Sequence, residues 1–354
     1  MRTLQGAGLK DFLEGALGTR ETALGLQPLR LNDQIMDFCH PALRAAHVAE
    51  ATNGVRLRFT GEPRVIEVEI DLVTSERTAF ALQAAATAPP TIDLTVDGAL
   101  RDRRTLDHSD QTQRLKYDFA GAPAGAVFEL WLPHNTGARI RAISSDAPLI
   151  AVPDDRPRWI FHGSSITNDA LAPGPSETWP ALLSSQRAWH LTQLGFRGEC
   201  HLDPGVARSI AATPAEGIIL ELGINVHNFQ TFRQRTFISA IHGFLQTIRE
   251  GHPRARLIVV SPVFGAEREI EDSSVTMDGN RLSGDLTLPM IREALREAVA
   301  TRVRHGDQEV SYVDGLELLG PDEATLFPDG LHPNTEGTVL LTKRLAAHLS
   351  RTQL

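Results

Sequence analysis

Residues 158–167 read Arg-Trp-Ile-Phe-His-Gly-Ser-Ser-Ile-Thr, a short apolar run that passes directly into a Gly-Ser-Ser turn. Such a run predicts a buried strand, because it is apolar without alternation and is bounded by turn residues. Four further runs of the same kind follow, at residues 190–194, 218–222, 257–260 and 310–313. Together they predict five strands that are buried on both faces.

Segments of helical period lie between these runs. In one of them Phe237, Ile241, Phe244 and Ile248 form a stripe at spacings of four, three and four, which Gly251 and Pro253 terminate. Two more helices are marked by Ile291, Leu295 and Val299 and by Leu341, Leu345 and Leu349. Buried strands that alternate with helices predict an α/β fold: a flavodoxin-like three-layer αβα domain around a parallel five-stranded sheet.

The preceding part of the chain has a different period. From about Gly54 to Ser145 apolar and polar residues alternate, as in Ile66-Glu67-Val68-Glu69-Ile70, with turn signals such as Asp97-Gly98 between the runs. This pattern predicts an antiparallel β-sandwich, jelly-roll-like in kind. The first fifty residues show no clear period and are expected to be mostly irregular. We therefore predict a sandwich domain over residues 1–152 and an α/β domain over residues 153–354.

Composition excludes several classes of protein. The chain has 354 residues, 42% of them apolar, and a net charge of −9 without any run of five or more like charges, so nucleic acid is not an expected partner. Neither a membrane-spanning stretch nor a secretory leader is recognisable, so we expect a cytoplasmic protein without a membrane partner. A homo-oligomer remains open.

The two cysteines predict neither a disulfide framework nor a metal site. Cys39 and Cys200 lie in different predicted domains, and both are expected to be reduced and buried. Cys200, His201 and Asp203 fall within four residues, too close together to surround one ion. We expect no metal and no cofactor. Cys200 as a nucleophile is an alternative that only His201 favours.

The carboxyl ends of the predicted parallel strands carry residues suited to nucleophilic catalysis. In such sheets the ligand site lies beyond these ends. Ser165 could supply an attacking oxygen there, while His332 and Asp329 could supply a base and the carboxylate that orients it. Amides of a serine and a glycine, with the Asn225 side chain, could hold an oxyanion. The alternative is structural: a helix-capping turn at Ser165 and a local turn at Asp329.

At this point the residues resemble the SGNH or GDSL-type serine hydrolases. The motif Gly-Asp-Ser-Leu is similar to Gly163-Ser164-Ser165-Ile166, in which Ser164 departs from the aspartate. Gly198 is the best match to the glycine of the second block. Gly223 and Asn225 match the third block, Gly-x-Asn-Asp, where Val226 replaces the last residue, and Asp329 and His332 match Asp-x-x-His fully.

The resemblance implies a function as well as a fold. It covers residues 158 to about 350, and a subset of the family has an N-terminal sandwich and reads Gly-Ser-Ser-Ile-Thr at the nucleophile. It implies catalysis by Ser165, His332 and Asp329 through an acyl-enzyme, with an oxyanion hole of Ser165, Gly198 and Asn225. The expected substrate is a small-molecule ester.

Two other functions stay open at this stage. An acyltransferase would use the same site with an alcohol in place of water, and a non-catalytic carbohydrate-binding protein would use only the sandwich. His162 and His227 flank the predicted site and are candidates for substrate contact. Residues 265–285 form a long polar connection of the kind that often serves as a lid or specificity loop.

Overall fold

The computed structural model describes residues 1–44, 48–73, 89–109, 111–119, 123–271, 276–277, 280–281 and 284–351. The chain divides into two compact units. The first contains Met1–Pro157 and Ala172–Gln193, and the second contains Arg158–Leu171 and Leu194–Leu354. Residues 172–193 thus cluster with the N-terminal part, and the division at residues 152 and 153 remains a prediction.

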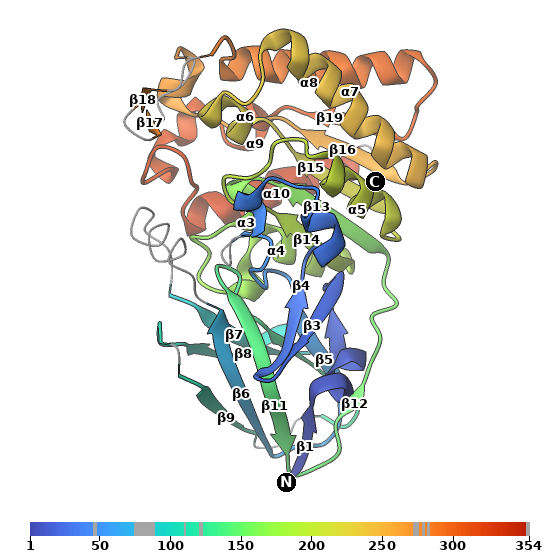
Figure 1. Ribbon diagram of the computed structural model, residues 1–354, viewed down its shortest axis with the longest axis vertical. Coiled ribbons are helices and arrows are strands. Elements are labelled where there is room, and N and C mark those ends of the chain that lie inside the picture. Colours follow the sequence, from blue (N-terminus) through green and yellow to red (C-terminus); the bar gives the residue numbers. More distant parts are fainter. Residues whose placement is uncertain are drawn as a thin grey trace. The chain divides into compact units, whose positions relative to one another are not determined.

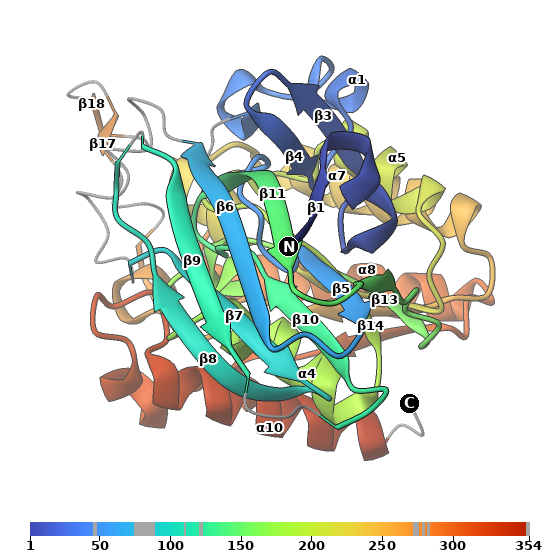
Figure 2. The same ribbon diagram turned by 90° about the horizontal axis from the view of Figure 1, so that it is seen from below.

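The first unit is a sandwich of two antiparallel sheets (Figure 2). One sheet has the order β3-β4-β11-β6-β9, with β1 also paired to β11; its strands are β1 (Arg2–Gln5), β3 (Gly18–Thr22), β4 (Gly25–Leu29), β6 (Val65–Val73), β9 (Gln113–Asp118) and β11 (Gly137–Ser145). The other has the order β12-β5-β10-β7-β8, with β2 paired to β5; its strands are β2 (Leu13–Glu14), β5 (Arg56–Thr60), β7 (Thr91–Val96), β8 (Ala99–Thr105), β10 (Val127–Trp131) and β12 (Ile150–Ala151).

The alternating sequence pattern explains this sandwich. In β6 the side chains of Ile66, Val68 and Ile70 are fully buried in the core of the unit, whereas Glu67 is exposed. Successive side chains of a strand point to opposite faces, so one face of each sheet supplies the core. Phe59 and Phe128, directly opposite each other on β5 and β10, stack there with ring centroids 5.5 Å apart.

The expectation of an irregular N-terminus was wrong. Within the first fifty residues β1, β3 and β4 join one sheet and β2 joins the other. The strands are too short for alternation to show: β2 has two residues, and β4 contains Pro28 and begins at Gly25. The helical segments of this unit are also short, namely η1 (Gly6–Phe12), α1 (Asp33–Met36), η2 (Pro41–Arg44), η3 (Pro175–Glu177) and α4 (Trp179–Arg187).

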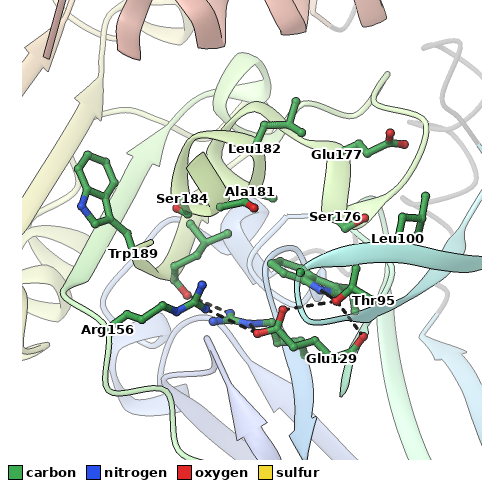
Figure 3. A pocket seen from close by; sticks show the side chains of 15 residues that line it. Thr95, Leu100, Glu129, Arg156, Ser176, Glu177, Ala181, Leu182, Ser184 and Trp189 are labelled. Carbon is green, nitrogen blue, oxygen red and sulfur yellow. Dashed lines mark hydrogen bonds and ion pairs between the residues drawn. The ribbon is translucent and has the colours of Figure 1, made fainter. Parts of the chain in front are cut away.

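A buried ion-pair network lies in this unit beside a pocket of about 220 Å³ (Figure 3). The guanidinium of Arg56 is 2.9 Å from Asp154 and 3.3 Å from Glu129, and Arg156 also binds Asp154. Trp131 packs over Arg56, with the guanidinium carbon 4.9 Å from the ring centroid. Arg56, Glu129 and Arg156, which line the pocket, are thus held in ion pairs, and loss of one partner would leave an uncompensated buried charge.

The parallel sheet that the sequence predicts belongs to the second unit, apart from residues 190–193 of its edge strand β14, which cluster with the first. Its order is β14-β13-β15-β16-β19, which is the flavodoxin-like order 2-1-3-4-5. The strands are β13 (Arg158–Gly163), β14 (His190–Gly195), β15 (Gly217–Glu221), β16 (Arg256–Val260) and β19 (Val310–Val313). All five predicted runs are therefore confirmed as strands, and the predicted fold class is confirmed.

Helices cover both faces of this sheet (Figure 1). On one face α5 (Pro204–Ala212), α7 (Gln234–Gly251) and α8 (Leu288–Arg304) pack in sequence, and α10 (Thr335–Arg351) lies on the other. The three predicted stripes are buried on α7, α8 and α10. Shorter helices are α3 (Ser165–Asn168), α6 (Ile224–Phe229), η4 (Ala266–Glu269), α9 (Gly315–Leu318) and η5 (Pro321–Leu326), and β17 (Thr276–Met277) pairs with β18 (Asn280–Arg281).

Among the helices of the described residues, none has the length and apolarity that crossing a bilayer requires.

Candidate active site

The predicted site residues of the second unit follow the carboxyl ends of adjacent strands. Ser165 begins α3 directly after β13, Gly198 follows β14, and Asn225 lies on α6 after β15. Because β13 is the neighbour of both β14 and β15, these three ends share one edge of the sheet. Asp329 and His332 lie in the turn before α10.

Ser165, His332 and Asp329 form a hydrogen-bonded chain. The Nε2 atom of His332 lies 2.8 Å from the Oγ atom of Ser165. Its Nδ1 atom lies 2.6 Å from the Oδ2 atom of Asp329. Ser165 is largely buried, whereas the Asp329 side chain is 47% exposed. The two ends of the chain therefore differ in their access to water.

The protonation states follow from the carboxylate. Partial burial acts to raise the pKa of Asp329, but the ring and backbone hydrogen bonds from His332 and that from the Leu331 amide together outweigh it, so the pKa lies well below its usual value. An ionised carboxylate only accepts hydrogen bonds, so the ring must donate Nδ1–H to Asp329. The lone pair of Nε2 then faces the hydroxyl of Ser165, which is the arrangement a general base needs.

Asp329 also makes the local turn of the structural alternative. Its Oδ1 atom accepts hydrogen bonds from the backbone N–H groups of Leu331 (3.0 Å) and His332 (2.7 Å). Its other oxygen contacts the His332 ring. Asn334 likewise accepts from Gly337 N–H at the start of α10. The turn thus fixes the carboxylate that orients the imidazole. The local turn and the orienting carboxylate, which the sequence offered as alternatives, are therefore compatible.

A hydrogen bond from the Cys200 backbone fixes the orientation of the Asn225 side-chain amide. It is almost fully buried, and its Oδ1 atom accepts from the backbone N–H of Cys200 at 3.1 Å. Because the oxygen is occupied by this contact, the Nδ2 group faces away from the Cys200 amide and remains a donor. Gly223, which precedes α6, has φ +116°, a conformation that side chains with a Cβ rarely adopt.

Gly198 also has a backbone conformation that favours glycine. Its φ is +73°, while a Cβ added there would meet only Phe229, at 3.9 Å. The carbonyl oxygen of Gly198 lies 2.8 Å from Nε2 of His201. The loop after β14 is therefore held on one side by His201 and on the other by the contact of Cys200 with Asn225.

Three further side chains support these segments, and sequence reasoning did not single them out for such a role. His201 binds the Gly198 loop. Arg268 donates to Asn228 on α6 at 3.0 Å and to the carbonyl of Gly330 at 3.2 Å, so it connects two segments of the site. Glu221, at the end of β15, accepts from the N–H of Ser164, the residue before Ser165. An acidic residue at the end of an apolar strand was the available signal for Glu221.

The other predicted candidates, His162 and His227, make their contacts with the protein itself. His162 is buried, with Nδ1 2.8 Å from the Leu194 carbonyl and Nε2 3.5 Å from the Cys200 sulfur. His227 is buried, with Nε2 2.9 Å from the Glu271 carbonyl. These contacts engage ring atoms that a substrate would need. Neither histidine is proposed as a substrate contact.

Cys39 and Cys200 are not joined in a disulfide. Burial raises the pKa of the Cys200 thiol well above its usual value, which disfavours a thiolate nucleophile. Cys39 is only partly buried, so the expectation that both are buried holds for Cys200 alone. In the described ranges no cluster of histidine, cysteine, aspartate or glutamate is arranged to hold a metal ion.

The connection at residues 265–285 is described in part. Arg292 on α8 binds both carboxylate oxygens of Glu269, at 2.7 and 2.8 Å, and so anchors η4. Residues 272–275, 278–279 and 282–283 lie outside the described residues. A role of this segment as a lid remains a prediction.

Solved structures with the same fold include acyl-transfer enzymes. The salicylyl-acyltransferase SsfX3 from a tetracycline biosynthetic pathway is 26% identical, with a TM-score of 0.84, and the match covers 100% of this chain and 98% of that one. A family two carbohydrate esterase from Clostridium thermocellum, solved with cellohexaose, is 16% identical over 88% of this chain and 96% of that one, with a TM-score of 0.61.

The acetyl xylan esterase Est2A from the rumen bacterium Butyrivibrio proteoclasticus is 13% identical, with a TM-score of 0.62 over 100% of this chain and 99% of that one. At these identities the two esterases share the fold with this chain. None of the curated proteins compared with the chain matches it. The model of the GDSL-like lipase/acylhydrolase family matches residues 161–340, more than half of the chain. This chain therefore belongs to the GDSL-like lipase/acylhydrolase family, as the motifs predicted.

Proposed function

We propose that the protein is a serine-dependent esterase that cleaves a small acyl ester through an acyl-enzyme. The observation that carries the proposal is the chain of hydrogen bonds from Ser165 through His332 to Asp329. A serine hydroxyl is a weak nucleophile at neutral pH unless an adjacent base takes its proton. The His332 ring is oriented for that step by its hydrogen bond to Asp329, whose lowered pKa keeps it ionised as an acceptor.

The proposed reaction has two stages. In the first, Ser165 Oγ forms a bond to the carbonyl carbon of the ester while its proton moves to Nε2 of His332. The Ser165 and Gly198 amides and the Asn225 Nδ2 group hold the resulting oxyanion. His332 then returns the proton to the leaving alcohol as the carbon–oxygen bond breaks. In the second stage His332 takes a proton from water as the water oxygen bonds to the acyl carbon, and the ring then returns that proton to Ser165 Oγ as the bond between Oγ and the acyl group breaks.

An acyltransferase is the second candidate. The similarity to a salicylyl-acyltransferase over the full length of the chain favours it, and the first stage of the reaction would be the same. The two candidates differ in what cleaves the acyl-enzyme. Products formed from one activated ester, with and without a panel of small alcohols, distinguish them: free acid alone supports the esterase, and a new ester supports the transferase.

The proposal is tested with a Ser165→Ala variant. We expect nitrophenyl-ester turnover to fall by at least about 10³-fold while the melting temperature stays near that of the wild type. A fluorophosphonate, which phosphonylates activated serines, should label the wild type at Ser165 and leave the variant unlabelled. Thr342→Val, which removes a buried hydroxyl on α10 outside the proposed site, serves as the control. If the Ser165→Ala variant kept most of the wild-type rate, Ser165 would not be the nucleophile.

A further inference from the structure

Glu221 is a buried carboxyl beneath the turn that carries Ser165. It ends β15, and only 3% of its surface is exposed. Its Oε2 atom accepts hydrogen bonds from the Ser164 N–H at 2.8 Å, the Ser164 hydroxyl at 2.6 Å and the Thr167 hydroxyl at 3.1 Å. One oxygen atom thus binds the residue before Ser165 and a residue after it.

The neighbouring glycine leaves room for this carboxyl. A Cβ added to Gly163 would lie 2.7 Å from the Oε2 atom of Glu221, closer than real Cβ contacts come. The last residue of β13 is therefore fitted to the carboxyl, since any larger residue would displace it from the turn. Gly163 of the nucleophile motif is thus required for the present position of the Glu221 carboxyl.

Glu221 occupies a site where burial is unfavourable for a charge. Burial raises the pKa of its carboxyl, and this effect exceeds the opposing hydrogen bonds from Ser164 and Thr167. An apolar side chain could fill such a position without this cost. A carboxyl at this position is therefore unfavourable for stability by itself. Its contacts with Ser164 and Thr167 suggest that it serves the turn between them.

Ser164 stands where the family motif Gly-Asp-Ser-Leu has an aspartate. The chain thus lacks a carboxylate beside the nucleophile in sequence, yet Glu221 brings one to the same turn from the adjacent strand. We propose that Glu221 replaces the missing motif aspartate and is the positioning residue of the nucleophile turn. This inference rests on the proposed function, in which Ser165 is the nucleophile.

The proposed action follows from the size of α3. This helix has four residues, Ser165–Asn168, too few to be stable by itself. Ser164 caps it by accepting from the Ile166 N–H at 3.1 Å, and the same hydroxyl donates to Glu221. Glu221 therefore fixes the cap and, through it, the direction of the Ser165 Oγ bond toward His332. Displacement of a reacting group by about 1 Å can cost roughly 10²-fold in rate.

The test compares two substitutions of the same residue. Glu221→Ala removes the acceptor, and we expect kcat to fall about 10²-fold with KM unchanged, because the turn acts on the reacting oxygen. Glu221→Gln keeps an acceptor oxygen for the three donors, and we expect it to stay within about tenfold of the wild-type kcat. A wild-type kcat for Glu221→Ala, or an equal loss in both variants, would overturn the proposal.

Smaller changes keep the test valid if Glu221→Ala does not fold. Thr167→Val and Ser164→Ala each remove one donor to Glu221, and both should lower kcat without raising KM. Thr342→Val is the matched control, since Thr342 is a buried hydroxyl on α10 that donates to the Thr338 carbonyl at 2.8 Å. If Thr167→Val and Ser164→Ala both kept the wild-type kcat, the proposal would be wrong.

Moving the carboxylate from position 221 to position 164 provides an independent test. Ser164→Asp restores the family motif but sets a second carboxyl against Glu221, and like charges at this distance disfavour each other. We expect Ser164→Asp alone to lose activity and Ser164→Asp/Glu221→Gln to recover part of it. A double variant no better than the product of the two single effects would contradict the shared role.

Fluorophosphonate labelling separates this inference from the proposed function. Absence of labelling at Ser165 in the wild type would refute the nucleophile itself. Labelling of the wild type, with an equal labelling rate in Glu221→Ala, would refute only the role of Glu221. We expect labelling of the wild type and slower labelling of Glu221→Ala, since the probe reports the reactivity of Ser165 directly.

Discussion

The Nε2 atom of His332 lies 2.8 Å from the Oγ atom of Ser165, although 167 positions separate the two residues in sequence. The fold accounts for this contact. Ser165 follows β13 and His332 precedes α10, so both lie at the carboxyl edge of the parallel sheet. Thr338 on α10 also donates to Asp169 at the end of α3, at 3.0 Å, which connects the segments that carry the two residues.

Asp329 provides a pH-dependent contribution to stability. Its pKa is lower in the folded chain than the ordinary 3.8, so the contribution is fully present above that value and is lost as the pH falls through the lower, folded pKa. We expect the melting temperature of the wild type to exceed that of Asp329→Asn near neutral pH. The difference should shrink as the pH falls below about 4. Melting curves of both proteins across this range give the measurement.

A constant difference between the two proteins down to the most acidic conditions would contradict this account. His332→Gln is the matched control, because it removes the ring that donates to Asp329 but leaves the backbone hydrogen bonds to Oδ1. In that background the effect of Asp329→Asn should be smaller.

Two substitutions of Asn225 distinguish its contact with the Cys200 N–H from its proposed role as an oxyanion donor. Asn225→Asp keeps an oxygen that can accept from the Cys200 N–H, but it removes the Nδ2 donor and adds a negative charge. We expect kcat to fall by about 10² to 10³-fold in Asn225→Ala and by at least as much in Asn225→Asp. Steady-state kinetics on an activated ester measure both. Near wild-type turnover in Asn225→Asp would remove this side chain from the oxyanion hole.

Gly198 tests the backbone of the same loop. Gly198→Ala should destabilise the protein by about 1 kcal/mol, because a residue with a Cβ is strained at its φ of +73°. A Cβ has space there, since its nearest neighbour is Phe229 at 3.9 Å, so the effect should come from the backbone. Gly198→Asn is the matched control, because asparagine tolerates this conformation better. Chemical denaturation of the three proteins provides the comparison, and equal stability of Gly198→Ala and the wild type would contradict the reasoning.

The parallel sheet could be predicted because its strands are continuous apolar runs between turn residues. Each of the five runs, beginning with Trp159–Phe161, became a strand. The N-terminal strands could not be predicted in this way. Strands such as Leu13–Glu14 and Gly25–Leu29 are held by pairing with strands distant in sequence, and two to five residues are too few to establish a period.

The side chains that support the proposed site were also difficult to predict from the sequence, because their contacts join distant segments. Ser165, Asp329 and His332 stand in short motifs, so their types and order pointed to a chemistry. The contact of Cys200 N–H with Asn225, and that of Arg268 with Gly330, depend on backbone geometry and on distant segments. Glu221 reaches Ser164 across adjacent strands. Local spacing does not reveal these contacts, although an acidic residue at the end of an apolar run sets Glu221 apart.

The most direct test of the account is to trap the acyl-enzyme. The wild type is mixed with an activated ester, quenched in acid within the first turnovers, digested and analysed by mass spectrometry. We predict an added acyl mass on the peptide that contains Ser165 and none on that peptide in Ser165→Ala. An acyl group attached to Cys200 or Ser164, or turnover by the Ser165→Ala variant at the wild-type rate, would contradict the assignment of Ser165 as the nucleophile.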